Sequence, residues 1–478
     1  MGFSALNYTE KMMKKAAKTA HTAHYTPRAT LAAIGVRLRT LDLLGPIKEQ
    51  VKINQKTIKY EPFDKLQDAL ITILAGAHGL SEVNTRLRSD PALQKAFGRE
   101  SCADQSVVQA TLNACTSINV AQMMAALDQI FQRRSKASEH DYRARMMLID
   151  IDLTGLPCGK KCEDAAKGYQ AEAGIRWGRQ LGRVIAAPYE EIVIDRLYPG
   201  NLYLTKVLRP LVQDLEKTLN LDEEKKSRTI IRMDAGGGST DEVNWLLERG
   251  YQIHGKDFSV VRAEGLASCV KNWIADPKHT HRQMGWVEEE IEGYVRPVKR
   301  LILRWPPMKE EERKKKPFHY ACLLSTLEPA EVIKQLNLPA HTIENQEAMT
   351  LAYSTLYDKR GGTVEVEIKE SKQGIGINKR SKKRFAAQQM IILLGSLAHN
   401  ILVWSRRWLT AGAPRFAKYG ALRIVRDLFH ISGLLEFNEA GQLRKVTLNK
   451  AAPYVREIAS ALNKLLATKD VTIEVGAT

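Results

Sequence analysis

The segment "RMMLIDIDLTG" (residues 145–155) is a short apolar run that carries two carboxylates, Asp150 and Asp152, toward its end. This composition predicts a buried strand of a core sheet. A second apolar run, "RTIIRMDAGG" (residues 228–237), ends in the same way, with Asp234 followed by glycine. An aspartate at a strand end is more often a turn cap, but α/β sheets also build their sites in the crevice outside the carboxyl ends of the strands. We therefore expect these acids to border an open crevice.

The segments around these two strands alternate between strand and helix patterns, which implies a mixed α/β core. Further strands are expected at 179–188 and 190–201, where Pro-Gly-Asn forms a turn. Helices are expected at 205–219, at 239–250 and, with a long apolar face, at 384–409.

The bulk composition indicates a soluble protein with a polyanionic partner. The chain has 478 residues and a net charge of +18, and an excess of that size is most often matched by nucleic acid, with an anionic membrane surface as the rival. The most apolar stretch, 390–404, is interrupted by Ser396, His399 and Asn400, so no spanning segment and no secretory signal are expected. We expect the six cysteines to be free thiols in a reducing cytosol, with a zinc site at Cys158 and Cys162 as the weaker alternative.

The N-terminal part of the chain reads as a basic arm followed by helices. Residues 1–60 form the expected arm, which would lie along phosphates or remain a solvated tail; its basic residues include Lys11, Lys14, Lys15, Lys18, Arg28, Arg37 and Arg39. Two short helices at 89–98 and 101–115 suggest a helix-turn-helix. Gln105, Ser106 and Gln109 would lie on the exposed start of its second helix, where base edges could be read, although such helix pairs are also common in ordinary cores.

A third charged segment, "YDKRGGTVEVEIKESK" (residues 357–372), is ambiguous by itself. The alternation from Val364 to Lys369 suits a half-buried strand. Glu365 and Lys372 are seven residues apart, so they would share a face if the segment were a helix. Two glycines and several β-branched residues make a helix locally poor.

Taken together, "DIDLTG", "RMDAGGGSTDEVNWLLERGYQIHGK" and "YDKRGGTVEVEIKESK" resemble the three catalytic boxes of a DDE transposase. The chain resembles the bacterial insertion-sequence-four superfamily, and within it most nearly the thirteen-eighty group, over roughly residues 60 to 450. In that family the third box has the pattern Tyr, two residues, Arg, three residues, Glu, six residues, Lys, and it is helical. Here four residues separate Arg360 from Glu365, and the extra one is expected at 361–363, where glycine absorbs a kink.

The resemblance implies a set of site residues. Asp152, Asp234 and Glu365 would be the catalytic carboxylates and would hold two Mg²⁺ (or Mn²⁺) ions. Asp152 is preferred because Thr154 completes the family's Asp-x-Thr, with Asp150 as the alternative; Glu367 is the alternative to Glu365 but fits the spacing to the lysine less well. The resemblance also assigns three residues to the phosphates of the transposon end, namely Tyr357, Arg360 and Lys372.

The resemblance further implies a ribonuclease-H-like catalytic core with a mainly β insertion and a small C-terminal region. The long gap between Asp234 and Glu365 would hold the insertion, in which Trp273, Trp286 and Trp305 are candidates for holding a flipped base, although a buried tryptophan is more often a core residue. The expected domains are the basic arm (1–60), the helical DNA-binding region (61–140), the catalytic core (141–258 plus 351–410), the insertion (259–350) and the C-terminal region (411–478).

The expected function is that of a DNA transposase that binds terminal inverted repeats, cleaves the element's ends and joins the 3′-hydroxyl to target DNA. Its partners would be the transposon-end repeats and target DNA, with a homodimer in the active complex and no membrane. The expected location is the bacterial cytoplasm, at the nucleoid. Two rivals remain: a nuclease on the same fold that cuts without joining, and a domesticated DNA-binding protein without catalysis.

Overall fold

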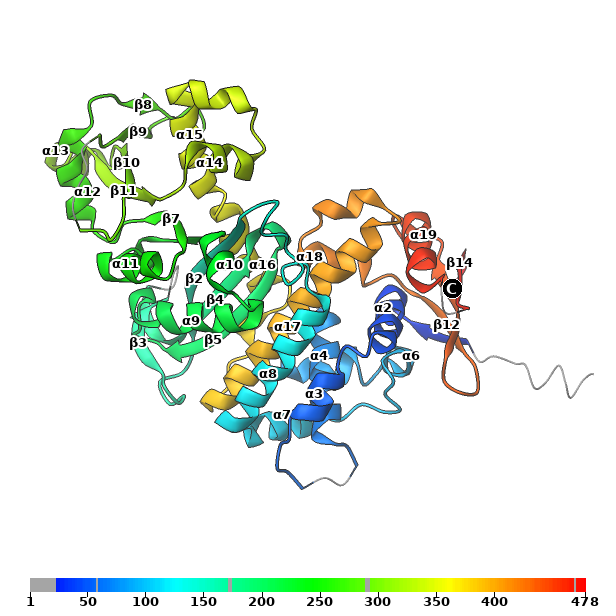
Figure 1. The fold of residues 1–478 in the computed structure, drawn as a ribbon. Helices are drawn as coiled ribbons and strands as arrows, with labels where there is room; N and C mark the ends of the chain where they lie inside the picture. Colours follow the sequence, from blue (N-terminus) through cyan, green and yellow to red (C-terminus); the bar gives the residue numbers. More distant parts are fainter. Residues whose placement is uncertain (1–22, 57–58, 171–173, 289–292, 468–469) are drawn as a thin grey trace, which may run out of the picture. The chain divides into compact units, whose positions relative to one another are not determined.

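The computed structural model describes residues 23–56, 59–170, 174–288, 293–467 and 470–478 (Figure 1). The chain divides into two compact units. The central unit comprises the described residues of Met123–Lys372 and Ser381–Asn400. The terminal unit comprises the described residues up to Gln122 together with those of Gln373–Arg380 and Ile401–Thr478.

One mixed sheet organises the central unit. Its strands lie in the order β3-β4-β2-β6-β7-β11-β10-β9-β8, and β5 also pairs with β4. Their bounds are β2 Met147–Pro157, β3 Ala166–Tyr169, β4 Ile175–Ala186, β5 Glu191–Pro199, β6 Thr229–Met233, β7 Gln252–Lys256, β8 Ile274–Ala275, β9 Gln283–Trp286, β10 Lys299–Trp305 and β11 His319–Ser325.

The strands β5, β4 and β2 are antiparallel, whereas β2, β6 and β7 run parallel. The prediction of a mixed α/β core is thereby confirmed, and this order agrees with the ribonuclease-H-like core that the resemblance implies. The parallel pairing places Asp150 beside Arg232 in register, and Asp234 directly follows the end of β6. The apolar start of β2 is fully buried, which is why this stretch reads as an uninterrupted hydrophobic run.

Helices complete the core of the central unit. The helix α9 (Leu204–Leu219) packs on β4 and β5, and α11 (Thr240–Glu248) packs on β7. Ser239 caps α11 by accepting the backbone N–H of Glu242. The apolar side chains of these helices and of the strands form one buried cluster.

The long helix α17 (Phe385–Thr410) is apolar enough, by length and composition, to cross a membrane, but 94% of its apolar window is buried inside the protein. Its polar side chains bond to β5. The Asn400 amide pairs with both the N–H and the carbonyl of Ile192 at 2.9 Å, and Ser396 donates to Asp195 at 2.6 Å. The polar residues that interrupt the apolar run are therefore hydrogen-bonding groups of a core helix.

The expected insertion, residues 259–350, joins the sheet. Its strand β11 pairs antiparallel with β7, and β10, β9 and β8 follow outward. It also contains α12 (Val260–Leu266), α13 (Glu310–Lys315) and α14 (Pro329–Leu336), so its described part mixes strands and helices where a mainly β segment was expected. The segment joins the sheet because the edge of β7 offers backbone groups that β11 satisfies.

The terminal unit contains the sheet β1-β12-β13-β14, built from both ends of the chain. Its strands are β1 (Ala23–Thr26), β12 (Gly433–Phe437), β13 (Leu443–Asn449) and β14 (Thr472–Gly476), and its helices include α2 (Ala29–Thr40), α3 (Gly45–Gln50), α4 (Pro62–Leu74), α6 (Pro91–Ala96), α7 (Gln105–Ala114) and α19 (Val455–Leu466).

Residues 23–50 differ from the arm expected over residues 1–60, because β1 pairs with β12 and the apolar face of α2 is buried. Arg28 is itself buried and lies 4.0 Å from Asp90. Lys11, Lys14, Lys15 and Lys18 lie outside the described residues.

The expected helix-turn-helix also differs from the structure. Asp90 caps α6, Asp104 caps α7, and Gly98 follows α6 with a φ of +77°. Residues 97–104 therefore form a longer connection than a tight turn. In addition, α6 packs mainly on α2 and α7 mainly on α4, so the two helices do not form a closely packed pair.

Candidate active site

The two aspartates of β2 have different surroundings. Asp150 is fully buried and accepts two hydrogen bonds from the Arg232 guanidinium, at 2.6 Å and 2.8 Å. Arg232 also donates to the carbonyl of Leu356, at the end of the helix that leads into the third box. Asp150 is thus half of a buried ion pair, which leaves Asp152 as the better candidate for holding a metal ion.

Asp152 lies beside Arg360 and partly reaches solvent. Its side chain is 15% exposed, and its Oδ1 lies 3.1 Å from an Arg360 guanidinium nitrogen. Burial raises the pKa of Asp152 to about 6; the Arg360 charge opposes the shift, and the negative charges of Asp234 and Glu365 add to it. Asp152 therefore lies close enough to the other two carboxylates that the resemblance selects for their charges to act on it.

Asp234 follows β6 at the start of a tight turn. Its Oδ1 accepts the backbone N–H of Gly236 at 2.9 Å. The turn passes very close to β7, since a Cβ on Gly238 would lie 1.8 Å from the carbonyl oxygen of Lys256. Glycine is required there, and it holds Asp234 near the carboxyl ends of β6 and β7.

The third box is helical, so the strand interpretation is wrong and the helix is confirmed. The helix α15 (Gln346–Asp358) leads into a π-helical turn at Gly361–Glu365, and α16 (Val366–Gln373) follows. A π turn accommodates one more residue than an α turn and is frequent at functional sites. It lies where the extra residue after Arg360 was expected.

The two glutamates of the third box have different surroundings. The Glu365 side chain is 62% exposed, and its Oε1 lies 3.4 Å from the Arg360 guanidinium. Glu367 lies on the other side, with its carboxylate 3.5 Å from Nε2 of the buried His399. Glu365 therefore shares Arg360 with Asp152, whereas Glu367 faces the core.

The third box is pinned to the sheet by apolar contacts. Val364 and Ile368 pack with Ile185 of β4 and Ile192 of β5 in a small buried cluster. These contacts orient the opposite side of the turn, with Glu365, away from that cluster.

The residues expected to bind DNA phosphates occupy different environments. Arg360 is buried and faces carboxylates, and Tyr357 is buried with Lys256 Nζ 5.0 Å from its ring centroid. Burial raises the pKa of Tyr357, so the phenol is neutral. Lys372 donates to the Thr154 hydroxyl at 2.8 Å, two residues beyond Asp152 on β2. Contact with DNA remains a prediction for all three.

The two glutamines expected to read bases lie near the start of α7. Gln105 and Gln109 are half-buried and Ser106 is exposed. The Gln109 amide donates to Asn113 on the same helix at 2.8 Å. Base reading by these residues remains a prediction.

One residue at this edge was not singled out from the sequence. Lys256 ends β7, and burial lowers its pKa, while the negative charges of Asp358 and Asp234 oppose that shift. Its position in the sequence could have identified it. Lys256 ends the strand that runs parallel to β6, so it lies at the same edge of the sheet as Asp234.

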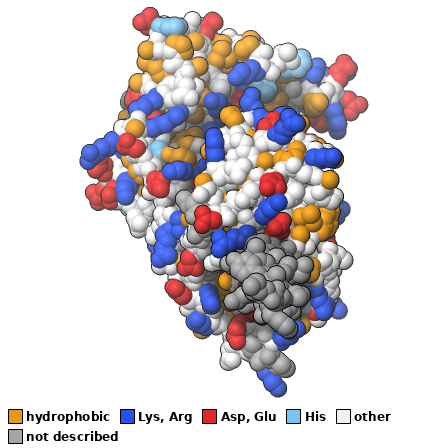
Figure 2. Space-filling model, turned by 90° about the vertical axis from the view of Figure 1, so that its right-hand side faces the viewer, with side chains coloured by type: hydrophobic (Ala, Val, Ile, Leu, Met, Phe, Trp, Pro, Cys, Tyr) orange, Lys and Arg blue, Asp and Glu red, His pale blue; other side chains and the backbone are white. Residues whose placement is uncertain are grey.

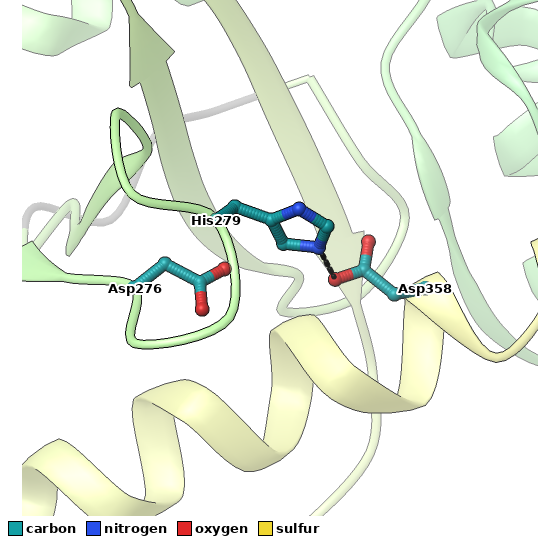
Figure 3. Close-up of side chains that lie close together, drawn as sticks. All are labelled: Asp276, His279 and Asp358. Atoms are coloured by element: carbon teal, nitrogen blue, oxygen red, sulfur yellow. Dashed lines mark ion pairs between the residues drawn. The ribbon is translucent and has the colours of Figure 1, made fainter.

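The carboxylates Asp152, Asp234 and Glu365 are hard oxygen donors of the kind that Mg²⁺ and Mn²⁺ prefer, and the donor set fits the expected ions. Among the described residues, Asp276, His279 and Asp358 form the group whose ligand atoms all lie within 4.8 Å of one another (Figure 3). Arg282 already bridges the two carboxylates of this second group, so it is an ion-pair network. It fastens the loop before β9 to the end of α15.

The three tryptophans of residues 259–350 are half-buried. Trp286 donates to Thr350 at 2.9 Å, and the Arg304 guanidinium lies 3.7 Å from the ring centroid of Trp273. Trp305 packs at a tilt on His319. All six cysteines are free thiols, as expected.

Comparison with known proteins identifies the family. The family model described as "Transposase DDE domain group 1" matches residues 39–470. None of the curated proteins matches the chain. A solved structure described as the piggyBac transposase synaptic complex with hairpin DNA is similar at 14% identity, covering 85% of this chain and 82% of that chain, with a TM-score of 0.43. With a family model matched over most of its length, the chain belongs to the DDE transposases.

Proposed function

We propose that this DDE transposase cleaves the ends of a bacterial insertion sequence and joins the freed 3′-hydroxyl to target DNA. The observation that carries the proposal is geometric: Asp152 and Asp234 each come one residue after the paired Ile151 and Met233 on neighbouring parallel strands, and Arg360 lies 3.1 Å from Asp152 and 3.4 Å from Glu365. When bound, two divalent ions would activate the attacking oxygen and stabilise the leaving one.

The residues of the chain would position the reacting groups. Asp152 stands on the paired strand β2 and Asp234 in a hydrogen-bonded turn, so the fold fixes the backbone of two of the three proposed metal-holding groups. Lys372 and Lys256 border the same edge and would place positive charge against the scissile phosphate.

DNA is the proposed partner, as the inverted repeats of the element and as target, and two copies of the chain would pair the two ends. The net charge of +18 supports a polyanionic partner. On the face drawn in Figure 2, Lys and Arg side chains are spread over the surface with acidic groups between them. The proposed location is the bacterial cytoplasm.

The test is a strand-transfer assay with pre-nicked element ends and a supercoiled target in Mg²⁺. We expect joined product from the wild type and none from Glu365→Gln. Glu347→Gln, at another exposed helical glutamate, is the matched control and should join normally. Cleavage without joining would favour the nuclease, and DNA binding without either reaction would favour the domesticated binding protein.

Affinity for DNA gives a second measurement. If Lys and Arg contacts to phosphates carry the binding, the association constant should fall roughly a thousandfold or more between 50 mM and 200 mM salt. A flat salt profile would remove phosphate contacts as the main source of affinity.

A further inference from the structure

The guanidinium of Arg360 occupies an unusual place for a residue expected to bind DNA. Its side chain is 3% exposed. Its nitrogens contact Asp152 Oδ1 at 3.1 Å, Glu365 Oε1 at 3.4 Å and the backbone carbonyl of Ile151 at 3.2 Å. The donor fork therefore points at two carboxylates expected to hold metal.

This arrangement has an electrostatic reason. Three carboxylates around one edge of a sheet repel one another, and a partly buried carboxylate without a counter-charge is costly. A divalent ion removes this cost when it binds. Before a divalent ion binds, a positively charged side chain must offset the repulsion between the carboxylates. Arg360 contacts two of the three carboxylates and is placed to do this.

We propose that Arg360 is an internal counter-cation of the metal site, which holds Asp152 and Glu365 until metal displaces it. The proposal rests on the function proposed above. Arg360 acts as a positioning residue that holds the two carboxylates in place and keeps them from pairing with other groups. Metal ions must then compete with its guanidinium for these carboxylates.

The chain next to Arg360 suits such a movement. Gly361 and Gly362 follow immediately, and they leave the backbone of the π turn more freedom than side-chain-bearing residues would. A Cβ at Gly362 would meet nothing within 4 Å, so this turn has open space beside it. We expect the guanidinium to withdraw while Val364 keeps the turn anchored in the core.

The test measures Mn²⁺ binding by calorimetry in the absence of DNA, with the full-length protein. Arg360→Met keeps most of the side-chain volume and removes the charge. We expect it to bind Mn²⁺ roughly tenfold more tightly, because the competing cation is gone. We also expect its metal-free melting temperature to fall and Mn²⁺ to restore it by a larger increment than in the wild type.

Two further variants keep the result interpretable. Arg99→Met breaks another buried ion pair, with Asp68, which contacts none of the three carboxylates, so it should lower stability and leave Mn²⁺ affinity unchanged. Arg360→Lys keeps one charge but cannot fork onto both carboxylates, so its Mn²⁺ affinity should lie between those of the wild type and Arg360→Met. It replaces Arg360→Met if that variant does not fold.

Equal Mn²⁺ affinity in the wild type and both Arg360 variants would overturn the proposal that Arg360 is a counter-cation. The case against it would be strongest if the same variants also bound DNA more weakly and their DNA affinity depended less on salt. That result would leave the proposed function intact, provided that Asp152→Asn abolished Mn²⁺ binding. A wild type that bound no Mn²⁺ at all would instead overturn the proposed function together with this inference.

Discussion

Asp150 and Asp152 are two residues apart on one strand, and replacing each by asparagine should have opposite consequences. In Asp150→Asn, the Arg232 guanidinium, only 1% exposed, loses its bidentate carboxylate and remains buried. In Asp152→Asn, a side chain that is 15% exposed loses its charge, and Arg360 keeps Glu365 as a partner. The first change should reduce stability and the second should remove metal binding.

The expected loss of stability in each variant follows from how deeply the replaced carboxylate and its arginine partner are buried. Breaking a fully buried ion pair by removing one partner costs about 3–5 kcal/mol, which is a large part of a typical domain stability of about 5–15 kcal/mol. For a unit of this size the melting temperature should fall by on the order of 10 °C. Asp152→Asn should cost only about 1 kcal/mol, because burial and the neighbouring carboxylates already disfavour the charge of Asp152 and Arg360 keeps Glu365 as a partner.

The assay is urea unfolding of the metal-free protein, followed by tryptophan fluorescence, with Mn²⁺ calorimetry on the same samples. Asp150→Asn should bind Mn²⁺ within a few-fold of the wild type at low temperature, where it is folded. The double variant Asp150→Leu/Arg232→Met, which removes both charges, should recover most of the lost stability. A stable Asp150→Asn that no longer bound Mn²⁺ would refute the reasoning and make Asp150 the metal ligand.

Three further predictions concern other parts of the central unit. Burial lowers the pKa of His254 to about 3, so between about pH 6.5 and pH 3 the unfolded chain binds a proton at this residue and the folded chain does not. The free energy of unfolding should therefore fall by about 1.4 kcal/mol between pH 7.5 and pH 5.5. In urea titrations at these two pH values, His254→Gln should show a smaller fall. Glu367→Gln should keep strand transfer, because this residue faces His399; loss of transfer equal to that of Glu365→Gln would contradict the assignment. Deleting Gly362 should leave Mn²⁺ affinity within a few-fold, whereas inserting one alanine beside it should abolish binding.

The sequence predicted the parts that depend on local patterns. The apolar runs before Asp152 and Asp234 became strands of one sheet because such runs are stable only when buried on both faces. The helices α6 and α11 also lie within the ranges 89–98 and 239–250 where helices were expected, with Asp90 and Ser239 as their caps. These features need only a few neighbouring residues, so they are readable from the sequence.

The sequence could not predict the features that depend on distant partners. The basic segment 23–50 looked like an arm, but β1 pairs with β12 more than 400 residues later, and no local pattern encodes that pairing. The surroundings of Arg360 were equally hidden, because a surface arginine and a buried one have the same sequence signature. Only the fold reveals that Arg360 meets Asp152, which is 208 residues earlier in the chain.

The extra residue of the third box shows that residue spacings in two sequences should be compared only after they are converted into side-chain positions on the helix. An α-helix turns about 100° per residue, so five residues from Arg360 to Glu365 would leave the two side chains about 140° apart. Four residues would bring them within about 40°, which suits a family pattern of Arg, three residues, Glu. A π turn closes its hydrogen bond one residue later, so a five-residue step does what four residues do in an α-helix, and the contact of 3.4 Å results. The departure from the family's spacing and the π turn therefore compensate each other, which favours Glu365 over Glu367 as the proposed third carboxylate.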